Sequence, residues 1–74
     1  MELLEITDKL TLSREAAADQ LRAIADALSR HNGLEYLYEG KKLHVRVPDE
    51  VRLEIEVEVK KKKGSIEIEL KWKQ

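Results

Sequence analysis

Apolar and polar residues follow a helical period in the first half of the chain. Between residues 13 and 31, apolar positions recur at spacings of 4, 3 and 4 residues, which places them on one face of a helix. These positions are Ala17, Leu21, Ile24 and Leu28. Ser13 is a preferred N-cap, and Asn32-Gly33 supplies the left-handed residue with which many helices end. The pattern predicts an amphipathic helix from Ser13 to His31.

After Gly33 the period changes from 3.6 to 2. Four runs of alternating apolar and polar residues follow, at residues 34–38, 42–47, 51–59 and 66–72. Half-buried strands joined by short turns are typical of an antiparallel meander. A further short strand is expected within Glu2 to Leu10, where Leu4 and Ile6 flank Glu5. We therefore expect one α+β domain over residues 1–74, with one amphipathic helix packed on a four- to five-stranded, mainly antiparallel meander sheet in the order β-α-β-β-β-β.

The strand register follows from parity and from the turns. A two-residue Glu39-Gly40 turn pairs Tyr38 with Lys41 and keeps the apolar residues of both strands on one face. For the last hairpin, a two-residue Lys63-Gly64 loop and a four-residue loop both keep the apolar faces together. The longer loop sets glutamates against glutamates, and like charges directly opposite are unfavourable. We therefore expect the two-residue loop.

Several of these segments together resemble the amphi-Trp domain, a family of small prokaryotic proteins. The resemblance begins at the helix with Leu12–Ala17 (LSREAA) and Arg22–Leu28 (RAIADAL). It continues through Val47–Val51 (VPDEV) and Leu53–Glu58 (LEIEVE) to the amphipathic closing strand Ile66–Trp72 (IEIELKW). It supports the architecture above and implies no biochemical activity, so no catalytic or binding residue is carried over. The run of four lysines departs from the more mixed charge of this turn in the family.

Composition narrows the classes of function. The 42% apolar content is too high for a disordered tail, and the absence of cysteine excludes disulfides, thiolate metal sites and thiol nucleophiles. Neither histidine has a second ligand at a metal-binding spacing, and phosphate-binding glycine loops and nucleophilic triads are missing. We therefore expect a non-enzymatic protein without cofactor or metal. Without an 18-residue apolar stretch or a leader, it is expected to be soluble and cytoplasmic, with no membrane partner.

The charges nearly cancel, with 14 Lys and Arg against 15 Asp and Glu and a formal net charge of -1. Alternate turns of a meander lie at the same end of the sheet, so two lysine-rich turns are expected to meet there. Such an end is a hypothetical site for anions or nucleic acid. Its residues are Lys41, Lys42, Lys60, Lys61, Lys62 and Lys63.

The apolar area of the sheet points to a second, favoured hypothesis. Four or five strands about 4.8 Å apart form a sheet roughly 19 to 24 Å wide, and one helix about 10 Å in diameter covers about half of it. Unless the N-terminal leucines cover the remainder, an apolar strip stays exposed and recruits a partner. We expect a homodimer or a protein-interaction module that uses this face or an edge strand, with Tyr36, Tyr38 and Trp72 as candidate interface residues. Trp72 has two interpretations, as a core residue beside Ile55 or as an exposed interface anchor.

Overall fold

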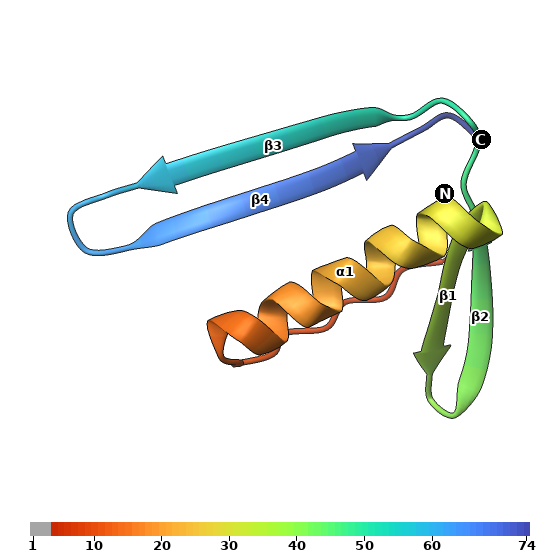
Figure 1. Cartoon of the computed structure of the whole chain (residues 1–74), viewed down its shortest axis with the longest axis horizontal. Coiled ribbons are helices and arrows are strands. Elements are labelled where there is room, and N and C mark those ends of the chain that lie inside the picture. The colour runs from red at the N-terminus through yellow and green to blue at the C-terminus, as the bar shows by residue number, and fades with distance from the viewer. Residues whose placement is uncertain (1–3) are drawn as a thin grey trace.

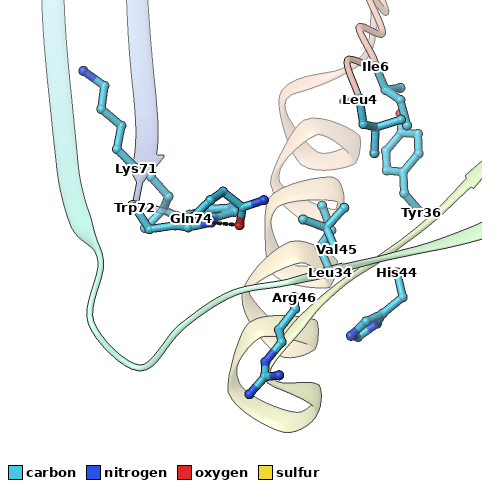
Figure 2. A pocket seen from close by; sticks show the side chains of 11 residues that line it. Leu4, Ile6, Leu34, Tyr36, His44, Val45, Arg46, Lys71, Trp72 and Gln74 are labelled. Atoms are coloured by element: carbon cyan, nitrogen blue, oxygen red, sulfur yellow. Dashed lines mark hydrogen bonds between the residues drawn. The ribbon is translucent and has the colours of Figure 1, made fainter. Parts of the chain in front are cut away.

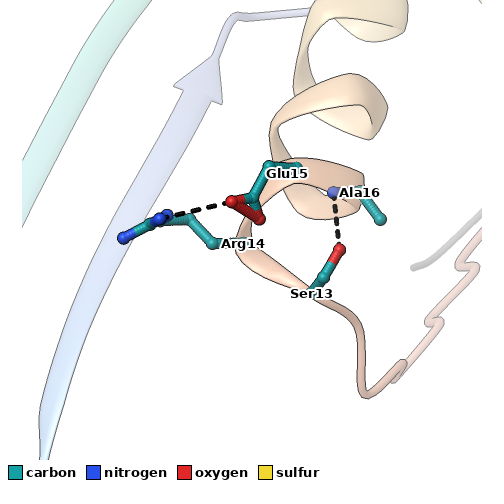
Figure 3. Close-up of polar contacts among 4 residues, drawn as sticks. All are labelled: Ser13, Arg14, Glu15 and Ala16. Carbon is teal, nitrogen blue, oxygen red and sulfur yellow. Dashed lines mark hydrogen bonds and ion pairs between the residues drawn. The ribbon is translucent and has the colours of Figure 1, made fainter.

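The helix is the first regular element of the computed structural model, which describes residues 4–74. Helix α1 spans Arg14–His31, and the Ser13 hydroxyl accepts a hydrogen bond of 3.0 Å from the Ala16 N–H (Figure 3). An N-terminal helix end carries unpaired N–H groups, and the serine satisfies one of them. Asn32, in the left-handed region at φ 55°, ends the helix. The predicted helix and its cap are confirmed.

The segment before the helix contains no strand between residues 4 and 13. It runs as an irregular chain alongside α1 (Figure 1). The expected strand within Glu2 to Leu10 is therefore wrong for residues 4–10, and residues 2 and 3 lie outside the described part of the chain. Alternation over Leu4–Ile6 is too short to form a strand without a partner ladder, and the chain follows the helix instead.

The first hairpin consists of β1 (Gly33–Tyr38) and β2 (Lys41–Arg46). Its antiparallel register pairs Tyr38 with Lys41 and Leu34 with Val45, as predicted. Glu39 and Gly40 both have positive φ, at 52° and 76°. Two such residues form the turn that matches the twist of a hairpin, so the two-residue turn fixes the register.

The second hairpin consists of β3 (Arg52–Val59) and β4 (Gly64–Lys71). The expected Lys63-Gly64 loop is wrong, because Val59 pairs with Gly64 and all four residues from Lys60 to Lys63 form the loop. The Lys60 N–H closes this loop by donating a 2.8 Å hydrogen bond to the Lys63 carbonyl.

This register sets two pairs of glutamates directly opposite each other. Glu54 pairs with Glu69 and Glu56 with Glu67. All four are exposed, so water screens the repulsion, and the Lys71 Nζ lies 3.3 Å from Glu69 Oε1 and 3.7 Å from Glu54 Oε2. The like-charge penalty is therefore too small to dictate the register.

The two hairpins form two separate two-stranded sheets, in place of one meander. In Figure 1 they diverge from the connection between β2 and β3. The Val47 N–H donates to the Asn32 carbonyl at 3.0 Å, and the next residue, Pro48, has no N–H to continue a ladder. Pairing thus stops at the end of β2, and the chain is α+β with two separate two-stranded sheets.

Packing between elements is restricted to neighbours along the chain. Among the helix and strands described, α1 contacts β1, and β3 and β4 contact only each other. No hydrophobic side chain in the described part of the chain is buried, and Gly33 is the only residue classed as buried there. The expected helix-on-sheet layer is therefore limited to α1 and the first hairpin. No described helix has both the length and the apolar character needed to cross a membrane.

Candidate interaction surface

A groove of about 910 Å³ lies between the first hairpin and the end of the second. One wall comes from the N-terminal segment and the first hairpin, and the other from the last residues of the chain (Figure 2). Its lining includes Leu4, Ile6, Leu34, Tyr36, Val45, Leu70 and Trp72, together with the polar residues His44, Arg46, Lys71 and Gln74. The groove is apolar with a polar margin, which is typical of a binding surface.

Trp72 forms the wall opposite the first hairpin. It lies one residue after β4, is half-buried, and donates its indole N–H to Gln74 Oε1 at 3.2 Å (Figure 2). Ile55, the expected core neighbour, pairs with Ile68 on the hairpin and is 63% exposed. Trp72 therefore does not form a buried core with Ile55 in the described part of the chain.

The other candidate interface residues divide between groove and solvent. Tyr36 is half-buried and lines the groove with Trp72, whereas Tyr38 lies at the end of β1 and outside it. The structure thus brings Tyr36 and Trp72 together and leaves Tyr38 apart. Leu4 and Ile6 were expected in a short strand and were not predicted to line a groove. Their alternation with Glu5 was the only signal that they share one apolar side.

His44 and Arg46 also line the groove, from positions that alternation assigns to the polar face of β2. The His44 ring lies over Gly33, and a Cβ at Gly33 would meet its Cε1 atom at 3.0 Å. Because Gly33 has no side chain, the His44 ring can lie over it. A glycine at the start of a strand was the only signal in the sequence.

The largest uncovered apolar surface is one face of the second hairpin. Seven aliphatic side chains on this face are between 36% and 83% exposed. They are Val51, Leu53, Ile55, Val57, Val59, Ile66 and Ile68, and we call this set the hairpin face. Because β3 and β4 alternate strictly, the set lies on one side and the glutamates on the other.

The polar side of the second hairpin is organised around Lys71. Its hydrogen bond with Glu69, followed by the negative charges of Glu54 and Glu69, raises the pKa of the Lys71 amine above 10.5. Arg52 forms a further ion pair with Glu54, at 3.2 Å. This side is a network of exposed ion pairs, and the described residues contain no group of three His, Asp or Glu side chains that could hold a metal ion.

The six candidate anion-binding lysines occupy two separate turns. Lys41 and Lys42 follow the β1–β2 turn, and the four-lysine loop joins β3 and β4 at a distant end of the molecule (Figure 1). Lys42 pairs with Glu35 at 3.0 Å and Lys60 with Glu58 at 3.5 Å. The two lysine-rich turns therefore do not meet at one end of the chain, as they would in a single meander sheet.

Comparison with known protein families gives one match. The model of the Amphi-Trp domain matches residues 2–74. The chain belongs to the Amphi-Trp domain family. No curated protein and no solved structure matches it significantly. The family resemblance seen in the helix start and the closing strand is thereby confirmed, and the family description names no ligand or reaction.

Proposed function

We propose that this Amphi-Trp domain is a non-enzymatic homodimerising module in which a second copy covers the apolar surfaces that one protomer leaves open. The observation that carries the proposal is the hairpin face, whose seven aliphatic residues stay 36% to 83% exposed and on which no described helix or other strand packs. An isolated two-stranded hairpin is marginally stable in water. An element of this kind needs a surface to pack against.

The exposed area fits a dimer interface of ordinary size. Complete burial of a Val, Leu or Ile side chain contributes about 1.5–3 kcal/mol at about 25 cal/mol per Å², or roughly 60–120 Å² each. At the observed exposures the hairpin face offers roughly 400 Å² of apolar area, and Leu21 and Ile24 of α1 add roughly 80 Å². Two copies then present about 950 Å² of apolar surface. Since apolar atoms make up about 57% of a typical interface, the total is near 1,600 Å², the standard size for a stable complex.

The two apolar surfaces of the chain also match each other in kind. Helix α1 exposes Leu21 and Ile24, and the hairpin face exposes only aliphatic side chains. We infer that in the dimer the α1 stripe packs on the hairpin face, which creates the helix-on-sheet layer expected from the sequence. A net charge of -1 per chain opposes this association very little.

Sedimentation equilibrium of the full chain at micromolar concentration tests the proposal. We expect a species of about 17 kDa, twice the 8.6 kDa chain. Val57→Gln places an amide on the hairpin face and is expected to weaken the dimer at least fivefold, because burying an unpaired amide costs about 1–3 kcal/mol. Glu56→Gln, on the other side of the same strand, is the matched control and leaves association unchanged. A monomer at all concentrations up to 100 μM, about the working range of the method, overturns the proposal.

Anion binding by the four-lysine loop is the second candidate. Lys61, Lys62 and Lys63 are exposed, and among the described residues no carboxylate lies within ion-pair distance of them. A loop of this kind attracts phosphates through a salt-dependent term. Binding of a single-stranded oligonucleotide at about 50 mM salt tests it. Lys61→Gln/Lys62→Gln should weaken binding more than Lys41→Gln, and a millimolar or weaker dissociation constant for the unmodified chain excludes it.

A further inference from the structure

The outer edge of β4 is an open strand edge. Among the described elements β4 pairs only with β3. The Lys60–Lys63 hydrogen bond fixes which residues face β3, because bonded and non-bonded pairs alternate along an antiparallel ladder. By this alternation the backbone N–H and C=O groups of Ile66, Ile68 and Leu70 point away from β3. They are available to another strand.

The charged residues along β4 and just after it are ordered so that two antiparallel copies of this segment bring opposite charges together. In sequence they are Glu67, Glu69, Lys71 and Lys73, two negative charges followed by two positive charges. When a second β4 is laid antiparallel about a two-fold axis at Leu70, each glutamate faces a lysine. The same alignment keeps apolar residues opposite apolar residues, and the outward backbone groups of Leu70 face their own copies.

The other edges lack this property. On β3 the charged residues are Arg52, Glu54, Glu56 and Glu58. An alignment about Leu53 pairs Arg52 with Glu54 but sets Glu56 against Glu50, and alignments with longer overlap set glutamates against glutamates. The outer positions of β2 are Lys42, His44 and Arg46, which carry no negative charge. One exposed charge pair contributes little, but a β4–β4 contact brings four pairs of opposite charge together, so β4 is better suited to a second copy than β2 or β3.

We propose that two copies of the chain join antiparallel about Leu70, along the last residues of β4 and the residues that follow it, and form a staggered sheet in the order β3–β4–β4–β3. Glu69 then pairs with Lys71 of the second copy and Glu67 with Lys73 of the second copy. Ile68 lies opposite Trp72 of the second copy, which gives the half-buried tryptophan an aliphatic neighbour. This inference rests on the proposed homodimer and specifies its register.

The dimensions of the sheet agree with the helices available to cover it. A two-fold axis perpendicular to the sheet keeps both hairpin faces on one side, and because Leu70 lies near the end of β4 the two hairpins extend from the axis in opposite directions. Each hairpin face, two strands wide and eight residues long, measures about 10 Å by about 27 Å. Each 18-residue α1 is about 27 Å long and about 10 Å wide. Each helix therefore matches the area of one hairpin face, and the two helices of a dimer match the two faces.

Charge reversal with mixing tests the register. Glu67→Lys/Glu69→Lys gives an all-positive edge and Lys71→Glu/Lys73→Glu an all-negative edge. We expect each variant alone to dimerise at least tenfold more weakly than the unmodified chain, and an equimolar mixture to form a heterodimer at least as tight as the original dimer, measured by native mass spectrometry. Far-UV circular dichroism confirms that each variant is folded.

A matched control separates the register from simple attraction between oppositely charged proteins. Glu54→Lys/Glu56→Lys has the same net charge as Glu67→Lys/Glu69→Lys but carries its lysines on β3. Mixed with Lys71→Glu/Lys73→Glu, it should form no comparable heterodimer. Equal heterodimer formation in both mixtures overturns the β4 register.

Cysteine cross-linking locates the axis independently, since the chain has no cysteine. Leu70→Cys should oxidise to a covalent dimer, because facing residues in a bonded antiparallel pair have Cα atoms about 5.5 Å apart, within the disulfide range. Ile66→Cys is the control, and its two copies would lie about 27 Å apart. If the unmodified chain dimerises but Leu70→Cys cross-links no better than Ile66→Cys, this register fails and the homodimer stands. If the unmodified chain is a monomer, both fail.

Discussion

Gly33 joins the helix to the first hairpin, and replacing it with alanine is a sharp test of the fold. An added Cβ would meet the backbone oxygen of Val45 closer than real Cβ atoms approach, and the His44 Cε1 atom at 3.0 Å. The histidine can rotate away, but the carbonyl belongs to the β1–β2 ladder, in which Leu34 pairs with Val45. The hairpin must therefore shift as a unit.

The expected cost follows from this overlap. Overpacking of this kind destabilises by about 1–3 kcal/mol. A 74-residue chain has a free energy of unfolding of about 4–11 kcal/mol at 0.05–0.15 kcal/mol per residue, so the loss is a large fraction of the total. A loss of about 2 kcal/mol corresponds to a Tm lower by about 8–16 °C for a domain of this size.

Thermal unfolding followed by far-UV circular dichroism measures this effect, at one fixed protein concentration because a dimer's Tm depends on concentration. Gly64→Ala is the matched control. Its nearest neighbour would be the Glu58 carbonyl oxygen at 3.6 Å, an ordinary contact, so we expect a Tm within a few degrees of the unmodified chain. If Gly33→Ala unfolds at the same temperature as Gly64→Ala, the close packing of β1 against β2 at this position is refuted.

Three further predictions concern the cap, the ion-pair network and the interface. Ser13→Ala should lower the free energy of unfolding by about 1 kcal/mol, measured by urea titration. Ser29→Ala, at an exposed helix position, is the control and should change it much less. Equal losses would contradict the capping role of Ser13. The pKa of the Lys71 amine, measured by NMR, should lie above 10.5 and should move back toward 10.5 in Glu69→Gln. Because the folded pKa is raised, the stabilisation is present below 10.5 and is lost as the pH rises through the folded pKa. A midpoint at or below 10.5 in the unmodified chain would refute this. Trp72→Ala should weaken the dimer at least tenfold while far-UV circular dichroism stays unchanged, and loss of folded structure at every concentration would instead indicate a core residue.

The helix and the first hairpin could be predicted because local chemistry specifies them. Ser13 and Asn32 define the helix ends through single hydrogen-bonding and backbone preferences, and Glu39-Gly40 fixes a two-residue turn. Each of these signals acts within a few residues. The structure agrees with the sequence at all three positions.

The second hairpin and the sheet order could not be predicted in the same way. The two-residue and four-residue loops considered from the sequence preserve the same alternation, and so does the observed Lys60–Lys63 loop. Charge was therefore the only guide, and exposed glutamate pairs such as Glu54 and Glu69 cost too little to decide the register. Alternation also does not tell whether consecutive hairpins share a sheet, and Pro48 ends the pairing between them.

The candidate site was predicted in part. Aromatic size and alternation marked Tyr36 and Trp72, and both line the groove. His44 and Arg46 were not predicted, because alternation assigns both to the polar face of β2. The His44 ring lies over Gly33, a contact across strands that no spacing along the sequence reveals.

The separation of the second hairpin from the rest of the protomer has a consequence for folding kinetics. Contacts between elements join only chain neighbours, α1 with β1, β1 with β2, and β3 with β4. A chain with such low contact order forms its elements quickly, within microseconds to milliseconds. In the proposed homodimer the covering of the hairpin face is a second-order step, so doubling the protein concentration should halve the time for Trp72 to reach its final fluorescence. During that interval the four lysines at the hairpin tip act as gatekeepers against the stacking of exposed strands into aggregates.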